Sequence, residues 1–250
     1  SYDGRSMLGD IASLKGITTG VHASLATNLA SVHGNATAMV NVMGLRGGDG
    51  NDTLIGNASS NYLEGGLGDD TLYGAASTAI DLEDDVASYM HASGGVTVDL
   101  NLTLDVSGAA QSGQPQGTPY GTSAGADGHD ALFGIENLIG SEYADTLAGN
   151  AKENWFQGRG GADSITGGSG TTPTGERIID AMSFEDQGHG VTVDLSVQTM
   201  TGGDAADIFS GIEGVDGTPF ADSLTGDGGN NWFTGNGGDD TIDGGGHAFS

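Results

Sequence analysis

A nine-residue repeat that occurs in three uninterrupted triplets constrains the fold of this chain more than any other feature. The triplets span residues 47–73, 140–166 and 217–243. Each unit begins with Gly, carries Asp or Asn at its sixth position and has a large apolar residue at its eighth. A short, fixed period of this kind indicates a solenoid in which successive units stack, and it gives no sign of a catalytic pocket.

The chemistry of one unit points to a metal ion. In the first unit, Gly47, Gly48 and Gly50 permit the positive-φ turns that other residues resist. The carboxylate at the sixth position is then expected to turn back toward exposed carbonyl groups, and hard oxygen ligands of this kind suit Ca²⁺. Positions seven to nine form a short strand with the eighth side chain inward. These inward residues are Leu54, Leu63, Leu72, Leu147, Phe156, Ile165, Leu224, Phe233 and Ile242.

If two units complete one coil, turns that lie eighteen residues apart stack on the same edge, with ions between them. This register pairs Asp52 with Asp70, Asp145 with Asp163, and Asp222 with Asp240. A further step back of eighteen residues predicts Asp127 and Asp204 as additional ligands. On the opposite edge, degenerate units at 131–139 and 208–216 place Glu136 opposite Asn154 and Glu213 opposite Asn231, and Asn61 holds the same position in the first triplet.

The predicted ions are therefore several, in about seven sites that each need several oxygen ligands. The middle unit of each triplet has Asn in place of Asp, which weakens its site by removing charge. In the first copy, Gly34 and Met43 stand where the other copies are predicted to carry acidic ligands. We therefore expect the first copy to bind the least calcium.

Composition supports a cationic partner. The 250 residues carry a net charge of -28, with 34 acidic and 6 basic residues. Nucleic acid and anionic membrane surfaces are disfavoured because they would be repelled, and no apolar run is long enough to cross a bilayer. The chain has 48 Gly and no Cys, so disulfides cannot hold it together. Such a chain tends to be disordered alone, and divalent cations are the natural means of ordering it.

A second repeat divides the chain into modules. Ser88 precedes the segment Gly-Val-Thr-Val-Asp-Leu at 95–100, and Ser183 precedes the same segment at 190–195. A faint third copy is assigned to Ser1 and residues 20–25. We predict three modules, 1–80, 81–176 and 177–250, with rolls at about 38–76, 122–170 and 199–246 joined by irregular β segments. Residues 104–125 are expected to form an exposed insertion, and 10–14 and 23–30 are weak candidates for helical turns.

The nine units resemble the RTX, or hemolysin-type, calcium-binding repeats of bacterial proteins exported by type I secretion. The segment 134–140, Gly-Ile-Glu-Asn-Leu-Ile-Gly, and the strand at 96–100 are also similar to those of large secreted RTX proteins. The resemblance implies an all-β fold of tandem parallel β-rolls, an extracellular location at the bacterial surface, and folding when the exported chain meets millimolar calcium.

For function, we expect a non-enzymatic array of a secreted surface protein: an adhesin stalk, a surface-layer component or a filament subunit. The chain has no His-Glu-x-x-His helix and no Gly-x-Ser-x-Gly elbow. Two alternatives remain: the C-terminal RTX region of an exported protease, lipase or alginate epimerase, or a polysaccharide-binding module. The second would use Tyr62, Trp155 and Trp232, which are expected to face outward, either packed on their own module or stacking on sugars or on a neighbouring subunit. The ends favour a window from a longer array, with head-to-tail stacking of copies as the alternative.

Overall fold

The computed structural model describes residues 10–74, 84–101, 120–125, 127–168, 170, 178–203 and 206–246, without the side chains of 120–122. All regular structure in these residues is β-strand, and most strands are three residues long. The described residues contain no helix, and therefore none that could cross a bilayer. The helical turns predicted at 10–14 and 23–30 are wrong, because both segments contain strand residues.

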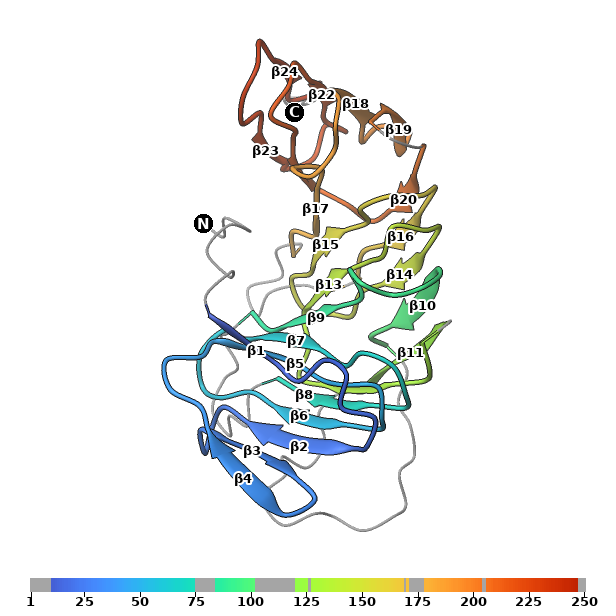
Figure 1. The fold of residues 1–250 in the computed structure, drawn as a ribbon. Helices are drawn as coiled ribbons and strands as arrows, with labels where there is room; N and C mark the ends of the chain where they lie inside the picture. Colours follow the sequence, from blue (N-terminus) through green and yellow to red (C-terminus); the bar gives the residue numbers. More distant parts are fainter. Residues whose placement is uncertain are drawn as a thin grey trace. The chain divides into compact units, whose positions relative to one another are not determined.

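The chain forms two compact units (Figure 1). Unit 1 comprises Ser1–Ser93 and Val98–Asn137, and unit 2 comprises Gly94–Thr97 and Leu138–Ser250. The strands of unit 1 are β1 (Ile11–Ser13), β2 (Val21–Ser24), β3 (Leu29–Val32), β4 (Asn35–Ala38), β5 (Gly44–Arg46), β6 (Thr53–Ile55), β7 (Tyr62–Glu64), β8 (Thr71–Tyr73), β9 (Val86–Ser88), β11 (Tyr120–Gly125) and β12 (Ala131–Phe133). Strand β10 (Val96–Asp99) contributes residues to both units.

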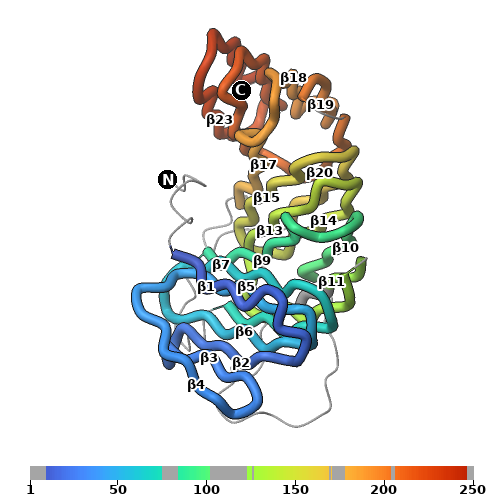
Figure 2. The backbone as a smooth tube through the Cα atoms, in the orientation of Figure 1, coloured from blue at the N-terminus to red at the C-terminus, as the bar shows by residue number. Residues whose placement is uncertain are grey.

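The strands of unit 2 follow the same pattern. They are β13 (Asn137–Ile139, with Asn137 counted in unit 1), β14 (Thr146–Ala148), β15 (Trp155–Gln157), β16 (Ser164–Thr166), β17 (Ala181–Ser183), β18 (Val191–Asp194), β19 (Thr199–Gly202), β20 (Ile208–Ser210), β21 (Gly214–Asp216), β22 (Ser223–Thr225), β23 (Trp232–Thr234) and β24 (Thr241–Asp243). Figure 2 shows the backbone of each unit winding in successive turns.

In unit 1, successive turns place their strands alternately in two sheets. One sheet contains the parallel strands β1, β5, β7 and β9, and the other contains β2, β6, β8 and β12, also parallel. Leu45 pairs with Leu63, and Leu54 with Leu72, so the predicted step of eighteen residues is confirmed. These four leucines are fully buried, because they form the apolar strip between the two sheets.

Unit 2 has the same architecture. Strands β13, β15, β17, β21 and β23 run parallel in one sheet, and β14, β16 and β20 run parallel in the other, where β18, β22 and β24 form a second parallel set. Phe156 pairs with Leu138, Leu147 with Ile165, and Val215 with Phe233. All are eighteen residues apart, and the predicted parallel β-roll is confirmed.

The segments that join the rolls form a sixteen-residue repeat. The position predicted for its first copy is wrong. The three copies span 10–25, 85–100 and 180–195, each with Asp first, Ser fourth, Gly eleventh and Leu last. Strand β1 pairs with β5 in the register in which β17 pairs with β21. The first copy therefore begins at Asp10 and contains Ser13, not Ser1. The seven-residue spacing from Ser13 to Gly20, equal to that from Ser88 to Gly95, was the signal available in the sequence.

The inserted segment at 104–125 lies largely outside the described residues. Its end, β11, pairs antiparallel with β12. The three predicted modules remain a prediction, since the two compact units reflect spatial contact and the modules reflect sequence repetition.

Candidate metal centre

In the first unit of each triplet, the side chain at the sixth position turns back onto its own turn, as expected. Asp52 accepts a hydrogen bond at Oδ2 from the backbone N–H of Gly48 at 2.5 Å. Asp145 accepts one from Ser141 at 2.6 Å, and Asp222 one from Thr218 at 2.7 Å. Each carboxylate is thus held by the N–H four residues earlier, which fixes it on the edge of the roll.

The glycine at the first position makes room for this carboxylate. A Cβ atom on Gly158 would collide with Oδ2 of Asp163, and one on Gly65 would collide with Oδ2 of Asp70. The same holds at Gly47, whose Cβ would also meet the carbonyl oxygen of Gly65 in the next turn. The sequence preference for glycine here is therefore steric and does not depend on a positive φ.

Replacing this glycine should damage the ladder as well as the fold. We expect Gly158→Ala to lower the unfolding free energy by about 1–3 kcal/mol, because the added methyl group overpacks the turn. It should also weaken calcium binding, since the Asp163 carboxylate must move. Gly244, where a Cβ would meet nothing within 4 Å, provides the control Gly244→Ala. Equal melting temperatures for the two variants would contradict this account.

On one edge of the rolls, the acidic side chains form ladders from turn to turn. In unit 1, the N–H of Asp52 donates to Oδ1 of Asp70 at 2.7 Å, and that of Asp70 to Oδ1 of Asp130 at 3.0 Å. In unit 2, Asp145 donates to Asp163 at 2.8 Å, Asp163 to Asp207 at 2.9 Å, and Asp222 to Asp240 at 3.0 Å. The three pairs predicted by the eighteen-residue step are therefore brought together.

The extension of this register to Asp127 is wrong. The N–H that lies on Oδ1 of Asp145 belongs to Val96, and the one on Oδ1 of Asp222 belongs to Val191. Asp127 instead accepts hydrogen bonds from the N–H and hydroxyl of Ser93, at 3.0 and 2.6 Å. Asp204 lies outside the described residues.

The error has a simple physical cause. Between Asp130 and Glu136, and between Asp207 and Glu213, the chain advances six residues instead of nine, because these half-turns omit the Gly-rich loop. A step of nine residues back from Glu136 therefore reaches Asp127, which lies three residues before the true ladder residue Asp130. Asp130 and Asp207 occupy the sixth position of units that begin at Gly125 and Gly202, so the repeat itself contained the signal.

The opposite edge carries a second ladder. Asn61 donates its N–H to Oδ1 of Asp85 at 2.8 Å, and Asp85 donates to Oε2 of Glu136 at 3.3 Å. In unit 2, Asn154 donates to Asp180 at 2.9 Å, and Asp180 to Glu213 at 3.0 Å. The amide of Asn231 reaches the carbonyl of Glu213 at 3.4 Å, so the predicted Glu213–Asn231 pair is adjacent.

Asp85 and Asp180 were missed by the sequence reading. Both are the first residue of the sixteen-residue segment, three positions before Ser88 and Ser183, and that constant spacing was the available signal. In the first copy, the amide of Asn61 donates to the carbonyl of Met43 at 3.4 Å, so Met43 occupies a ladder position without a carboxylate. Gly34 lies in the turn between β3 and β4 and not on a ladder. The expectation that the first copy binds the least calcium stays a prediction.

The ladder carboxylates are a poor arrangement without a cation. Asp70 and Asp163 are buried, and in each the Oδ2 atom has no hydrogen-bond partner. Burial, together with the nearby carboxylates of Asp130, Asp52 and Asp69, raises the pKa of Asp70 to about 8. Burial and the carboxylates of Asp207 and Asp145 likewise raise the pKa of Asp163 to about 8. A hard divalent cation supplies the missing partner, and these oxygen donors fit Ca²⁺.

The ladders differ from a compact metal cluster. No three acidic or histidine side chains in the described parts of the chain converge on one point. Consecutive carboxylates lie on consecutive turns, so a cation held by a ladder would draw on the side chains of two turns and on backbone carbonyls. Bound there, calcium would neutralise the stacked carboxylates.

Comparison with known families agrees with this donor set. Residues 46–77, 139–171 and 216–246 match the family described as RTX calcium-binding nonapeptide repeat (4 copies). These segments are RTX repeats. The chain thus carries a calcium-binding repeat region of the kind found in proteins exported by type I secretion. No curated protein sequence matches the chain significantly.

The raised pKa values of Asp70 and Asp163 predict how the RTX repeats respond to pH. A folded pKa of about 8 against an ordinary value of 3.8 means that, without calcium, these groups favour the fold fully below about pH 4. That contribution is lost as the pH rises through 8. Calcium must displace the protons, so we expect the calcium midpoint to be weaker at pH 6 than at pH 8.5. Calorimetry in two buffers of different ionisation enthalpy should detect proton release on binding, and its absence would contradict the assignment.

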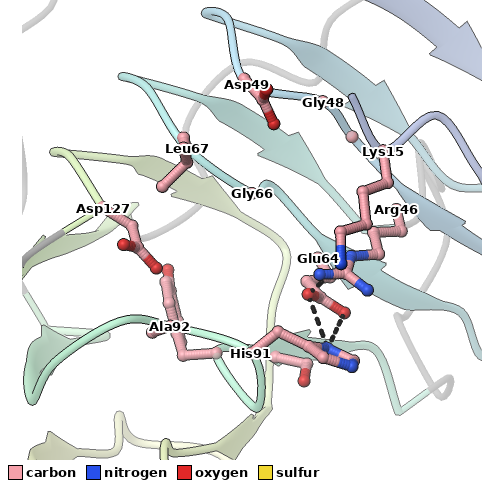
Figure 3. A pocket seen from close by; sticks show the side chains of 13 residues that line it. Lys15, Arg46, Gly48, Asp49, Glu64, Gly66, Leu67, His91, Ala92 and Asp127 are labelled. Carbon is pink, nitrogen blue, oxygen red and sulfur yellow. Dashed lines mark hydrogen bonds and ion pairs between the residues drawn. The ribbon is translucent and has the colours of Figure 1, made fainter. Parts of the chain in front are cut away.

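Unit 1 also contains a hollow beside the roll (Figure 3), lined by Lys15, Arg46, Glu64, His91 and Asp127 among others. Glu64 is buried and contacts Arg46 Nε and His91 Nδ1, both at 2.9 Å from its Oε1. Because the cationic Arg46 already partners Glu64, we assign this cluster as an internal ion pair and not as a further calcium ladder.

The aromatic residues at the seventh position do not all face outward. Tyr62 is buried, and its hydroxyl lies 2.7 Å from Ser88 Oγ on β9, so the expectation of an outward Tyr62 is wrong. Trp155 and Trp232 are partly exposed and pair in register with the small residues Ala181 and Gly214. Tyr62 thus contacts the neighbouring strand of its own sheet, and Trp155 and Trp232 lie beside the neighbouring strands of theirs.

Proposed function

We propose that this chain is a structural array and not an enzyme: a calcium-dependent rod segment of a secreted bacterial surface protein. It would serve as an adhesin stalk, a surface-layer component or a subunit of an extracellular filament. The observation that carries the proposal is the repetition of the acidic ladders. Asp70 and Asp163, for example, make the same link between turns in the two units.

The charge of the chain fits such a role. With a net charge of -28 and every ladder carboxylate except that of Asp240 buried, the folded coil needs cations to offset repulsion between its own turns. Cytosolic calcium is scarce and extracellular calcium is millimolar, which is the affinity range of extracellular calcium modules. Folding would therefore follow export, and the chain would become rigid only outside the cell.

Localisation of the native protein tests this role. Immunogold electron microscopy of the source cells, with antibody raised against the chain, should label the cell surface, a surface lattice or extracellular fibres. The structural role would be contradicted if the antibody instead detected a freely diffusing secreted protein and the same polypeptide had catalytic activity. That result would favour the alternative of an enzyme's accessory region.

The polysaccharide-binding alternative rests on Trp155 and Trp232, whose rings are partly exposed. Stacking on sugars would require those rings, whereas the buried Tyr62 is already engaged by Ser88. Glycan-array binding that is lost in the double variant Trp155→Ala, Trp232→Ala, with unchanged calcium-dependent circular dichroism, would support this alternative.

A further inference from the structure

Tyr89 is 7 % exposed, and its buried hydroxyl has no hydrogen-bond partner among the described residues. It lies directly after β9 at the first joint, the place where the segment 85–100 packs on the completed triplet 47–73 by pairing β9 with β7. The second joint is the corresponding contact of the segment 180–195 with the triplet 140–166. A buried hydroxyl without a partner is costly, and a bound ion or water molecule would remove that cost.

The hydroxyl of Tyr89 lies at the end of the acidic ladder of unit 1. It is beside the side chains of Asp130 and Ser123 but is not placed to form a hydrogen bond with either of them. Burial, with the carboxylates of Asp130 and Asp70 nearby, raises the pKa of Tyr89 well above its ordinary value. The group is therefore a neutral hydroxyl, which adds an oxygen to this place without adding a negative charge.

The last step of the ladder Asp52–Asp70–Asp130 contains a second oxygen of this kind. The N–H of Asp70 donates to Oδ1 of Asp130 at 3.0 Å, whereas Oδ2 of Asp70 is buried and forms no hydrogen bond in the described part of the chain. Two buried oxygens without partners, one from Asp70 and one from Tyr89, are thus found near the carboxylate of Asp130.

Orientation of Asp130 does not account for the Tyr89 hydroxyl. Ser123, on β11, donates its hydroxyl to Oδ2 of Asp130 at 2.8 Å and accepts the N–H of Asp130 at 3.2 Å. Because Oδ1 of Asp130 accepts the N–H of Asp70, both carboxylate oxygens are already held by hydrogen bonds. Asp130 is therefore fixed at the end of the ladder without a contribution from Tyr89.

The corresponding place at the second joint is apolar. Phe184 is the fifth residue of its sixteen-residue segment, as Tyr89 is of its own, and Met200 stands seven residues before Asp207, as Ser123 stands before Asp130. Phe184 and Met200 are 2 % and 3 % exposed, so both belong to the core. Packing of a joint therefore does not require a hydroxyl at this position, and the hydroxyl of the first joint needs another reason.

We infer that Tyr89 supplies its hydroxyl oxygen as a ligand to a calcium ion held by Asp70 and Asp130. Calcium takes about six to eight oxygen ligands and accepts uncharged ones. A hydroxyl group can give a lone pair to a cation while it donates its proton to a carboxylate. The ion gives both unpartnered oxygens a partner, and the second joint lacks this ligand because it carries Phe184. The inference rests on the calcium ladders and not on the proposed structural role.

Tyr89→Phe tests the ligand, because it removes only the hydroxyl and keeps the buried ring. Phe184 shows that phenylalanine is accommodated at this position of a joint. Tyr62→Phe is the matched control. The Tyr62 hydroxyl is also buried, but it is already hydrogen-bonded to Ser88 at 2.7 Å and lies on neither ladder.

Terbium luminescence gives the solution readout, since terbium replaces calcium in oxygen sites and emits when an adjacent tyrosine is excited. Emission excited through tyrosine, after subtraction of the tryptophan part excited at longer wavelength, should fall much more in Tyr89→Phe than in Tyr62→Phe. Equal losses in the two variants would overturn the assignment. Circular dichroism in saturating calcium on the same samples checks that both variants fold.

A crystal structure of the calcium-loaded wild type decides the question without any variant. We expect an ion between Asp70 and Asp130 with the Tyr89 hydroxyl oxygen about 2.3–2.6 Å from it. A water molecule as the only partner of the Tyr89 hydroxyl, or an ion at this step that Tyr89 does not contact, overturns the inference. Either result leaves the structural role of the chain untouched.

Discussion

Chelation of calcium should unfold most of the described β structure. At free calcium a hundredfold above the dissociation constant, each site that binds only the folded chain stabilises it by about 2.7 kcal/mol. Four such sites contribute about 11 kcal/mol, which is as large as the whole net stability of an ordinary domain, about 5–15 kcal/mol. The chain has no Cys for disulfides, and its net charge of -28 and 48 Gly oppose folding, so we do not expect the buried apolar strip to hold the fold alone.

Thermal melts followed by far-UV circular dichroism measure this effect. Excess chelator should abolish the cooperative transition, and readdition of calcium should restore it. Magnesium at the same concentration is the control, because its smaller ion demands stricter octahedral geometry and retains its water. An unchanged melt in chelator, or equal rescue by magnesium, would contradict the calcium account.

Asp163→Ala, at the middle of its ladder as Asp70 is of the other, should be more damaging than a change at a ladder end. Asp163 lies between Asp145 and Asp207, so its loss removes a calcium ligand that the sites toward both neighbouring turns would share. It also leaves the buried N–H of Asp145 without an acceptor, which costs about 1–3 kcal/mol in addition to the lost calcium stabilisation. Asp240→Ala, at the end of a ladder, removes one link and should have the smaller effect.

Two further variants separate the contributions at Asp163. Asp163→Asn keeps an acceptor for the Asp145 N–H and loses the charge, so it should retain calcium-free stability better than Asp163→Ala but bind calcium poorly. Asp194→Ala, at the last residue of β18 and on neither ladder, controls for removal of one negative charge. Calcium stoichiometry by calorimetry should fall most in the Asp163 variants. Equal stoichiometry in Asp163→Ala and Asp194→Ala would refute the ladder.

The sequence could predict the regular part of this fold because one residue pattern controls each step of it. The eighth-position residues Leu54, Leu72, Leu147 and Ile165 are buried and paired in register as predicted. Here the local turn chemistry and the apolar period agree, so a short repeat specifies both the strand and its stacking partner.

The ligand ladders could be predicted only where the repeat is unbroken. At the joints, a six-residue half-turn replaces the nine-residue unit. The ladder residue is therefore Asp130 and not the predicted Asp127. The strands stacked there come from distant segments: Asp70 meets Asp130 sixty residues later, across an insertion. Such long-range pairing follows from packing of the whole coil, and local periodicity does not contain it.

The most direct test of the ladders is a crystal structure of the calcium-loaded protein with ions located by anomalous scattering. We predict ions bound along the ladders Asp52–Asp70–Asp130 and Asp145–Asp163–Asp207. Ions bound at Asp127 with none at Asp130, or ladder carboxylates that bind no ion in saturating calcium, would contradict this account.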